Sequence, residues 1–549
     1  MSYTGSDPEK FNEDKQVVTE HFHIERIKDV SAAKDVDKVI EVRSGALAAA
    51  TTKAGRLDPW SKDSLLLYWC CFVAFLCSCA NGYDGSLMTA INIMPFYQDR
   101  INHGTVGEGT GIIFSIYTIG GLVGPWFAGP LTDRLGRRGG MFCGGLIICI
   151  GSAVIASSMH RAQFIAGRFI LGFGVSIMTC AAPSYIIEVS PPQWRSRMTA
   201  FYNCGWFGGS IPAAGITLGT QKINSDWQWR LPLIFQAVPS LIVMISVFFL
   251  PESPRWLLAN SRDDEALAFL TRFHGNNDPT NPVVELEWQE FKESISVDGA
   301  DKRWWDYSEL FKTRSARWRS LMVILMGVFG QFSGNGLGYF NTQIYQAVGY
   351  GNYMQFVLNL ANSITSAAGA LTGVALSDRM PRRLALVWGT FGSAVFLAIN
   401  GALSAVWAHQ PAGQQNLSVG RGAVAAYFFF NIVYSFAYTP LQALYPVECL
   451  QTTARAKGMA MYGVVVNLLN FINQFAGPIA LQNIKYNYVF IFVGWDLVET
   501  VLWYIFCIET NGRTLEELEE VFAQKNPIKA SKVKRRVAIK KDGGIALVE

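Results

Sequence analysis

Asp84 and Arg168 are ionisable residues inside long apolar stretches of this sequence, where charge is costly. Asp84 belongs to the apolar stretch Leu65–Leu87, and Arg168 belongs to Phe164–Ile187. Groups of this kind within a membrane span are rare and functional by default. Two roles are open: proton binding at Asp84 releases Arg168 and permits a conformational change, or the two residues form a permanent ion pair that joins two helices.

Two charged phrases each occur twice in the chain, in the same order. One phrase is Asp133-Arg134-x-Gly-Arg137-Arg138, which returns as Asp378-Arg379-x-Pro-Arg382-Arg383. The other is a Glu followed by an Arg: Glu188 with Arg195, and Glu448 with Arg455. Each copy lies between apolar stretches. This pattern is typical of a membrane transporter that is built from two related halves.

The repeated charges are predicted to form a cytoplasmic gate. Ion pairs at the cytoplasmic ends of helices would hold an outward-facing state shut and break when the protein opens inward. One exposed pair contributes only ~0–1 kcal/mol, but a network biases a two-state equilibrium. The alternative is that the arginines only fix the membrane topology. The predicted gate residues are Asp133, Arg134, Glu188, Arg195, Asp378, Arg379, Glu448 and Arg455.

The elements that must position these residues are apolar helices. The chain has 549 residues, of which 50% are hydrophobic and 16% are charged, whereas soluble domains contain ~25% charged residues. The sequence contains about twelve apolar windows of roughly 20 residues, each long enough to span a membrane as a helix. They are Leu65–Leu87, Gly111–Leu131, Met141–Met159, Phe164–Ile187, Met198–Leu218, Leu231–Leu250, Leu321–Val348, Phe356–Leu376, Leu384–Trp407, Ala423–Val447, Met459–Leu481 and Tyr488–Ile508. The prediction is an all-α membrane protein with two six-helix halves.

The distribution of charge predicts the topology. Arg and Lys concentrate in the connections on one side of the span count, so both termini are expected in the cytoplasm. The expected segments are a solvated tail (1–60), a first half (61–256), a cytoplasmic helical linker (257–318), a second half (319–508) and a second tail (509–549). Helices are expected to begin near Asp263 and Glu285 in the linker. Asn416, in an Asn-Leu-Ser triplet, is an expected outer glycosylation site.

Several classes of function lack their motifs in this sequence. No Walker loop, nucleotide fingerprint or zinc motif occurs, and no nucleophile–base constellation stands out. The ten cysteines have no metal-like spacing, and we expect them to act as packing residues without disulfides. We therefore expect that the protein is not an enzyme and that it binds no metal, no cofactor and no nucleic acid. Transport would use the gradient of a solute or an ion.

Further motifs carry a family resemblance. They are Pro183-x-Tyr185-x-x-Glu188, Pro251-Glu-Ser-Pro-Arg-Trp256 and Glu509-Thr-x-Gly512-Arg-Thr-Leu-Glu-Glu517. With them, the chain from about Trp60 to Asn526 resembles the sugar-porter family of the major facilitator superfamily. Asn81-Gly-Tyr-Asp-Gly-Ser-Leu and Gly330-Gln-Phe-Ser-Gly-Asn-Gly resemble fungal cellodextrin and lactose permeases. The resemblance implies a major facilitator fold and proton-driven uptake of β-linked glucose oligomers or lactose at the plasma membrane.

The resemblance also implies a sugar site between the halves. Side-chain amides both donate and accept hydrogen bonds, as every sugar hydroxyl does. The implied contacts are Asn203, Gln331, Asn335, Tyr339, Asn341 and Asn470. Bonding between helices is the alternative role for these polar groups, and Trp206 or Phe340 could cover a sugar ring. Many monosaccharide porters have Gln where this chain has Asn203, and often Trp where it has Ala443. The lost bulk is consistent with a longer sugar.

Two other functions remain open. A passive facilitator of the same fold would use Asp84 without proton transfer. A membrane sugar sensor would signal through its cytoplasmic segments to a cytoplasmic partner, and it could keep the same binding and gate motifs.

Overall fold

The structure of this protein is a computed structural model that falls into two units. It describes residues 25–27, 36–40, 57–102, 108–298, 307–377, 379–411, 416–451, 454–511, 515–532, 536–540 and 545–548. One unit is the helical bundle, Leu57–Asn511, and the other combines Met1–Arg56 with Gly512–Glu549.

The first half of the bundle begins with α3, where the Ser61 hydroxyl caps the helix by accepting from the Ser64 backbone N–H at 3.1 Å. Its helices are α3 (Lys62–Ile91), α4 (Pro95–Tyr97), the π-helix η2 (Gln98–Asn102), α5 (Glu108–Ala156), α6 (Arg161–Val189), α7 (Arg195–Asn203), α8 (Gly205–Thr220), α9 (Trp227–Phe235), α10 (Ala237–Ser246) and η3 (Val247–Phe249). Helix α5 holds two of the predicted spans, which meet at a kink at Gly136, where φ is 79°. Only Gly adopts this conformation without strain, and the first charged phrase lies there.

The second half differs in its first span, which is broken. Its helices are α15 (Arg314–Phe332), the 3-10 helix η4 (Asn335–Phe340), α16 (Asn341–Ala347), α17 (Asn352–Ser377), α18 (Arg382–His409), α19 (Leu417–Cys449), α20 (Arg455–Ile484) and α21 (Asn487–Phe506). Between α15 and η4 the chain passes through Gly334, where φ is 82°. The sequence analysis expected an unbroken span from Leu321 to Val348.

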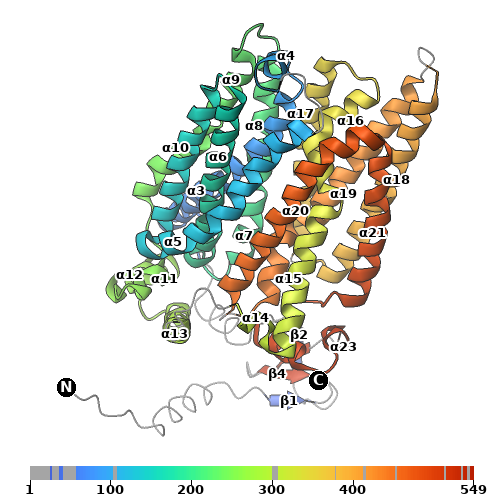
Figure 1. The fold of residues 1–549 in the computed structure, drawn as a ribbon. Coiled ribbons are helices and arrows are strands. Elements are labelled where there is room, and N and C mark those ends of the chain that lie inside the picture. Colours follow the sequence, from blue (N-terminus) through green and yellow to red (C-terminus); the bar gives the residue numbers. More distant parts are fainter. Residues whose placement is uncertain are drawn as a thin grey trace. The chain divides into compact units, whose positions relative to one another are not determined.

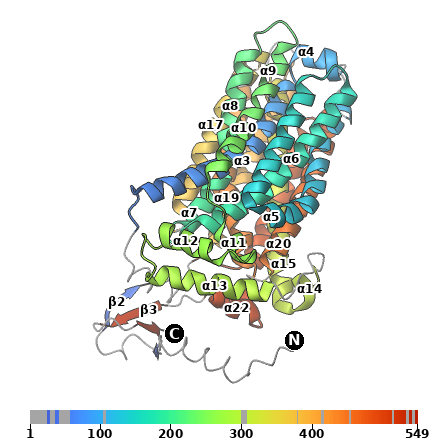
Figure 2. The ribbon, with the colours of Figure 1, turned by 90° about the vertical axis from the view of Figure 1, so that its left-hand side faces the viewer.

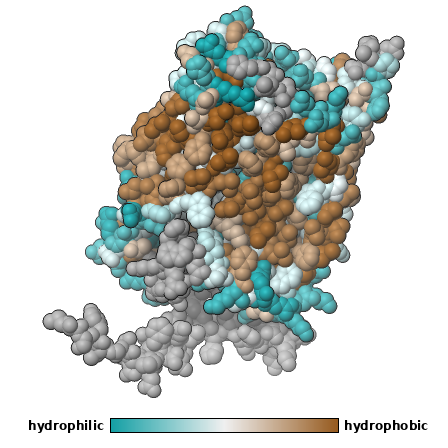
Figure 3. Space-filling view, in the orientation of Figure 1, coloured by the Kyte–Doolittle hydropathy of each residue, from teal (hydrophilic) through white to brown (hydrophobic). Residues whose placement is uncertain are grey.

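All predicted apolar windows fall on helices, so the all-α prediction is confirmed for the bundle. Among the described residues, nine helices are long and apolar enough to cross a membrane. One of the nine, α5, contains two of the predicted spans. The α7–α8 pair and α17, which hold two further predicted spans, do not meet the same criteria of length and hydropathy. First-half helices (blue to green) lie beside second-half helices (yellow to red) in Figure 1. A broad apolar band crosses the bundle, with hydrophilic side chains toward both ends (Figure 3).

The linker between the halves is helical, as predicted. It contains α11 (Pro254–Ala259), α12 (Asp263–Phe273), α13 (Pro282–Asp298) and α14 (Glu309–Lys312). These helices gather at one end of the bundle (Figure 2). Acidic residues fill the first turn of α12, where they complement the partial positive charge of a helix N-terminus.

The second unit corrects the prediction of a purely solvated tail for residues 1–60. It contains a sheet in the order β1-β4-β3-β2, with β1 parallel to β4 and the other pairs antiparallel. The strands are β1 (Glu25–Ile27), β2 (Val36–Ile40), β3 (Arg536–Lys540) and β4 (Ile545–Val548), and the helices are α22 (Leu515–Ala523) and α23 (Pro527–Lys532). Helix α22 lies within the segment predicted as the second tail.

Glycines allow the first-half helices to pack closely. A Cβ atom on Gly209 of α8 would lie 1.9 Å from the backbone oxygen of Cys79 on α3. No heavy atom lies within 4 Å of a Cβ built on Gly215, which belongs to the same helix. The two glycines therefore have the same local preference for helix but different packing.

We expect Gly209→Ala to destabilise the protein and Gly215→Ala to leave it stable. The added methyl group at residue 209 meets backbone, which cannot move aside as a side chain does, and such overpacking costs about 1–3 kcal/mol or more. The thermal unfolding midpoints of the two purified variants in detergent measure the difference. Equal midpoints would contradict the close packing of α3 on α8.

Candidate functional site

The two ionisable residues predicted within spans meet in the first half. Asp84 lies on α3 and Arg168 on α6, and Arg168 Nη1 donates to Asp84 Oδ1 at 2.5 Å. Their side chains are only 3% and 2% exposed, respectively. Gln236, at the junction of α9 and α10, donates from Nε2 to the same carboxylate oxygen at 2.8 Å. The sequence analysis missed Gln236, although a lone amide within an apolar span was a usable signal.

Arg168 has further partners on α5. Its Nε donates to the backbone oxygen of Ile113 at 3.4 Å, and its guanidinium lies 4.9 Å from the centre of the Tyr117 ring. The Tyr117 hydroxyl in turn donates to Asn81 Oδ1 at 2.9 Å. Arg168 therefore keeps a carbonyl and an aromatic face as partners even if Asp84 becomes neutral.

The residue after Asp84 brings the ion pair close to the broken seventh span. A Cβ atom on Gly85 would lie 3.5 Å from the Trp206 ring on α8 and 3.7 Å from the Tyr339 ring on η4. One turn later, Thr89 Oγ1 donates to the backbone oxygen of Tyr339 at 3.0 Å. A displacement of α3 would therefore act directly on η4.

Four of the predicted sugar contacts gather around this broken span. Asn335 Nδ2 donates to Gln331 Oε1 at 3.1 Å, and the Tyr339 hydroxyl interacts with the side chains of Asn470 and Gln474 on α20. Two members of the group were missed by the sequence analysis. Asn473 donates from Nδ2 to the Gln331 backbone oxygen at 2.9 Å, and Gln474 Oε1 is buried without a hydrogen-bond partner among the described residues.

The other two predicted contacts bond to different helices. Asn203 Nδ2 donates to the backbone oxygen of Thr439 on α19 at 2.5 Å, across the two halves. Asn341 Oδ1 accepts from the Tyr427 hydroxyl, and Asn341 Nδ2 donates to Asn359 Oδ1 at 3.4 Å. In this structure both side chains bond between helices, which is the alternative role noted for the set.

The aromatic candidates also separate. Phe340 is only 1% exposed and packs against Phe114 with ring centres 5.5 Å apart, so it has no free face for a sugar ring. Trp206 is half-buried and lies beside the amide group through its approach to Gly85. Trp206 therefore remains as the ring that could cover a sugar.

The first charged phrase and Glu188 form a network within the first half that runs from the exposed Asp133 to the buried Glu188. Arg137 donates two parallel hydrogen bonds to Glu188, Nε to Oε2 and Nη2 to Oε1, both at 3.1 Å. Arg137 also pairs with Asp133 at 3.3 Å. Ser253 donates its hydroxyl to Glu188 from the loop before α11.

The second half repeats this arrangement. Arg382 donates from Nε and Nη2 to Glu448 at 3.3 and 3.0 Å. The Thr510 hydroxyl donates to Glu448 Oε2 at 2.6 Å. Glu509 accepts from the backbone N–H groups of Arg382 and Arg383 at 2.9 and 3.1 Å. The repeated motif therefore produces the same carboxylate–guanidinium pair twice.

The structure corrects the arginine assignment of the predicted gate. Arg137 and Arg382 hold the two glutamates, whereas Arg134 and Arg379 are exposed and form no ion pair with a described residue. Asp378 lies outside the described residues, as does the side chain of Arg455. Both phrases contain several arginines, so residue type alone could not distinguish their partners.

Arg195 connects to the linker instead. Its Nη2 donates to Glu287 Oε1 on α13 at 2.7 Å. Glu287 also contacts His274 Nδ1, and His274 Nε2 lies 3.0 Å from the Val189 backbone oxygen at the end of α6. This buried cluster attaches the linker to the first half.

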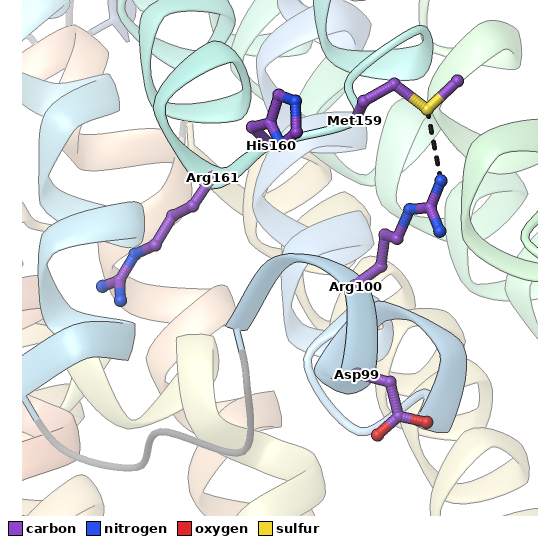
Figure 4. A pocket seen from close by; sticks show the side chains of 5 residues that line it. All are labelled: Asp99, Arg100, Met159, His160 and Arg161. Atoms are coloured by element: carbon purple, nitrogen blue, oxygen red, sulfur yellow. Dashed lines mark hydrogen bonds between the residues drawn. The ribbon is translucent and has the colours of Figure 1, made fainter.

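A surface pocket lies apart from these groups. It has a volume of about 410 Å³ and is lined by Asp99, Arg100, Met159, His160 and Arg161. Arg100 Nη2 lies 3.3 Å from Met159 Sδ, while the Arg161 side chain points away from them (Figure 4). None of the predicted sugar contacts belongs to this pocket.

Asn416, the predicted glycosylation site, is exposed as the N-cap of α19, and its side chain accepts from the Ser418 N–H at 3.0 Å.

Comparison with known families gives one match over most of the chain. The family described as "Sugar (and other) transporter" matches residues 70–522. The MFS-type transporter criB of Aspergillus cristatus is 27% identical over 460 residues, covering 83% of this chain and 93% of its own. A high-affinity glucose transporter of Kluyveromyces lactis is 25% identical, covering 83% and 85%. A quinate permease of Neurospora africana is 26% identical, covering 88% and 93%.

Solved structures share the fold. The proton:xylose symporter XylE, bound to 6-bromo-6-deoxy-D-glucose, has a TM-score of 0.68 at 18% identity, covering 84% of this chain and all of its own. A partially occluded inward-open form of XylE from E. coli has a TM-score of 0.65 at 16% identity, covering 80% and 99%. The predicted major facilitator fold is thereby confirmed.

The Glu287 cluster predicts how the linker attachment depends on pH. Burial disfavours the charged carboxylate, but the His274 ring and the Arg195 guanidinium outweigh this effect and hold the pKa of Glu287 below its usual value. A lowered pKa stabilises the folded state above the usual pKa of Glu, about 4.3, and this contribution is lost as the pH falls through the lowered value. We therefore expect Glu287→Gln to weaken the attachment at neutral pH, by ~1–3 kcal/mol.

Hydrogen exchange of α12 and α13 measures this effect. The variant should exchange faster than wild type at neutral pH, and the difference should shrink in strong acid. Glu265→Gln is the control, because Glu265 forms an exposed pair with Arg262 on α12. Faster exchange in the control alone would contradict the attachment.

Proposed function

The chain belongs to the sugar transporter family of the major facilitator superfamily, and on that premise we propose that it couples proton movement to sugar uptake across the plasma membrane. The proposed substrates are a disaccharide or short oligosaccharide: cellobiose, a cellodextrin or lactose. The observation that carries the proposal is the buried ion pair of Asp84 and Arg168. The proton is the coupling ion, and alternating access moves the sugar.

The proposed coupling follows from the partners of the pair. A proton on Asp84 removes the negative charge that holds Arg168, and Arg168 then relies on Tyr117 and the Ile113 carbonyl on α5. Helices α3 and α6 are thereby released from each other. Because α3 contacts η4 through Gly85 and Thr89, the release reaches the amide group around Tyr339. Proton binding and sugar binding would then bias the same conformational equilibrium.

The sequence bears on the length of the proposed sugar, and the relatives bear on its chemical class. The reduced bulk at Asn203 and Ala443 favours a sugar longer than a hexose. Known relatives include a glucose transporter and a quinate permease, and the structural relative XylE is named as a proton:xylose symporter. These names support a small polyhydroxylated substrate and proton coupling. Uptake assays must rank the individual sugars.

The topology belongs to the same proposal. With both termini and the linker in the cytoplasm, the loop between α18 and α19 faces outside. Asn416 in this loop is exposed, so we propose it as the glycosylation site.

The first test is uptake of radiolabelled cellobiose by cells without other sugar porters. Wild-type uptake should rise with external acidity and collapse with a protonophore. Asp84→Asn should lower accumulation by about tenfold, because typical coupling energies correspond to 5–150-fold effects. Asp226→Asn is the matched control, since Asp226 forms half-exposed pairs with Arg100 and Arg230.

A passive facilitator is the second candidate, and the two donors to Asp84 favour it. Arg168 and Gln236 both donate to the carboxylate, as expected for a permanent structural pair. Robust uptake that is indifferent to pH, protonophore and Asp84→Asn would establish the facilitator and exclude proton coupling. Absence of uptake despite surface expression would point to the sensor or to another sugar.

The amide group makes a separate prediction about binding. Tyr339→Phe removes only the hydroxyl that faces Asn470 and Gln474, so we expect KM for the transported sugar to rise about two- to tenfold, the equivalent of one hydrogen bond. Tyr345→Phe is the control, because the Tyr345 hydroxyl is buried without a hydrogen-bond partner among the described residues. An equal KM for both variants and wild type would remove Tyr339 from the sugar site.

A further inference from the structure

The second half contains two buried carboxyl groups that the proposed function does not use. Asp496 and Glu499 lie on α21, and both are 0% exposed. Residues three positions apart on a helix share a face, so the two carboxyl groups are neighbours. Acidic residues within a span require protonation, a partner or water.

Among the described residues, neither carboxyl group has a cationic partner. The helices packed around α21 are α15, α18, α19 and α20, and the sequence places their cationic residues at the ends of the spans. These cations are Arg314, Arg317, Arg319, Arg382, Arg383, His409, Arg421, Arg455 and Lys457. No ion pair joins Asp496 or Glu499 to any described residue. Arg382 is paired with Glu448, and Arg319 donates to the Cys449 backbone oxygen at 3.0 Å. The ionisable groups that face the pair are tyrosines of α19, Tyr434 and Tyr438.

Most of the carboxyl oxygens also lack a hydrogen bond. Both oxygens of Asp496, and Oε1 of Glu499, are buried without a partner among the described residues. Glu499 Oε2 accepts from the Ser333 hydroxyl. Two adjacent carboxylates with unsatisfied oxygens in an apolar interior would carry a large desolvation cost and would repel each other. Protonation removes both costs.

We propose that Asp496 and Glu499 form a second proton-binding site, which holds at least one proton at neutral pH. The proton binds a carboxylate oxygen directly, and it leaves to water when the site opens. Protonation of the pair does not depend on proton coupling at Asp84; its role in transport does rest on the proposed function.

The surroundings connect this site to the broken seventh span. Ser333, which contacts Glu499, directly precedes Gly334 and η4. Ser333 also lies 3.1 Å from the Tyr438 hydroxyl, which lies 2.7 Å from Thr390 Oγ1 and accepts from Trp503 Nε1 at 3.1 Å. A hydroxyl group has one proton to donate. Loss of the proton from the pair would draw the Ser333 hydroxyl to Glu499 and away from Tyr438, at the point where the span breaks.

Infrared spectroscopy of the purified wild-type protein tests the site without transport. A protonated carboxyl group has a carbonyl stretch that is separate from the carboxylate bands. We expect this band in wild type at neutral pH. Asp496→Asn and Glu499→Gln should each weaken the band, and the double variant should lose the whole contribution of the pair. The band should decrease as the pH is raised. Glu309→Gln is the control, because Glu309 is exposed and paired with Lys457, and it should change only carboxylate bands.

Three results would overturn the site. First, the spectra of the two variants at neutral pH could differ from the wild-type spectrum only by lost carboxylate signal. This result would show that both groups are charged in wild type. Loss of the protonated band on addition of sodium ions at constant pH would identify a cation site instead. Unfolding of both variants, with no pH-dependent protonated band in wild type, would indicate a structural pair.

Uptake at different pH values tests the role in transport separately. Glu499→Gln imitates the protonated form permanently, so its uptake should vary less with external pH than that of wild type. An unchanged pH profile, in a variant that has lost its infrared band, would overturn this role. If protonophore has no effect on wild-type uptake, the proposed function fails while the infrared result still decides the proton site.

Discussion

The cost of holding charge in an apolar interior determines how this bundle is arranged. A carboxylate there must be paired, hydrogen-bonded or protonated. The chain uses the first solution at Asp84, which receives bonds from Arg168 and Gln236. It uses the same solution at Glu188 and Glu448 near the ends of the spans, with Arg137 and Arg382. Each of these pairs joins two different helices, so neutralising charge also fixes helix positions.

The two halves are alike at the ends that carry the repeated charged phrases but differ in their interiors. The repeated phrases produce matching carboxylate–guanidinium pairs, each supported by a hydroxyl group from Ser253 or Thr510. In the interior, the first half contains an ion pair, whereas the second half contains two acids that form no ion pair with any described residue. A duplicated scaffold has therefore kept its loops while its internal polar groups diverged.

The sequence predicted the elements well because local patterns encode them. Apolar windows located every span, the acidic first turn located α12, and the rarity of charge in spans brought Asp84 and Arg168 together. Partners were harder to predict because they depend on three-dimensional packing. Arg137 could not be distinguished from its neighbouring arginines, and Glu287, the partner of Arg195, belongs to a linker with many acidic residues. Strand pairing between the two ends of the chain has no local signature at all.

The broken seventh span contacts both interior sites: α3, which holds Asp84, and Glu499 on α21. From one side, α3 contacts η4 through Gly85 and through the Thr89–Tyr339 hydrogen bond. From the other side, Ser333 contacts Glu499 immediately before Gly334. A continuous helix would resist bending at this point, whereas a 3-10 turn after a glycine of positive φ has fewer backbone bonds to lose. The amides that are candidates for sugar contact lie on and around this turn. On the proposed mechanism, a change of charge in either half reaches these amides by displacing one short segment, without unfolding a span.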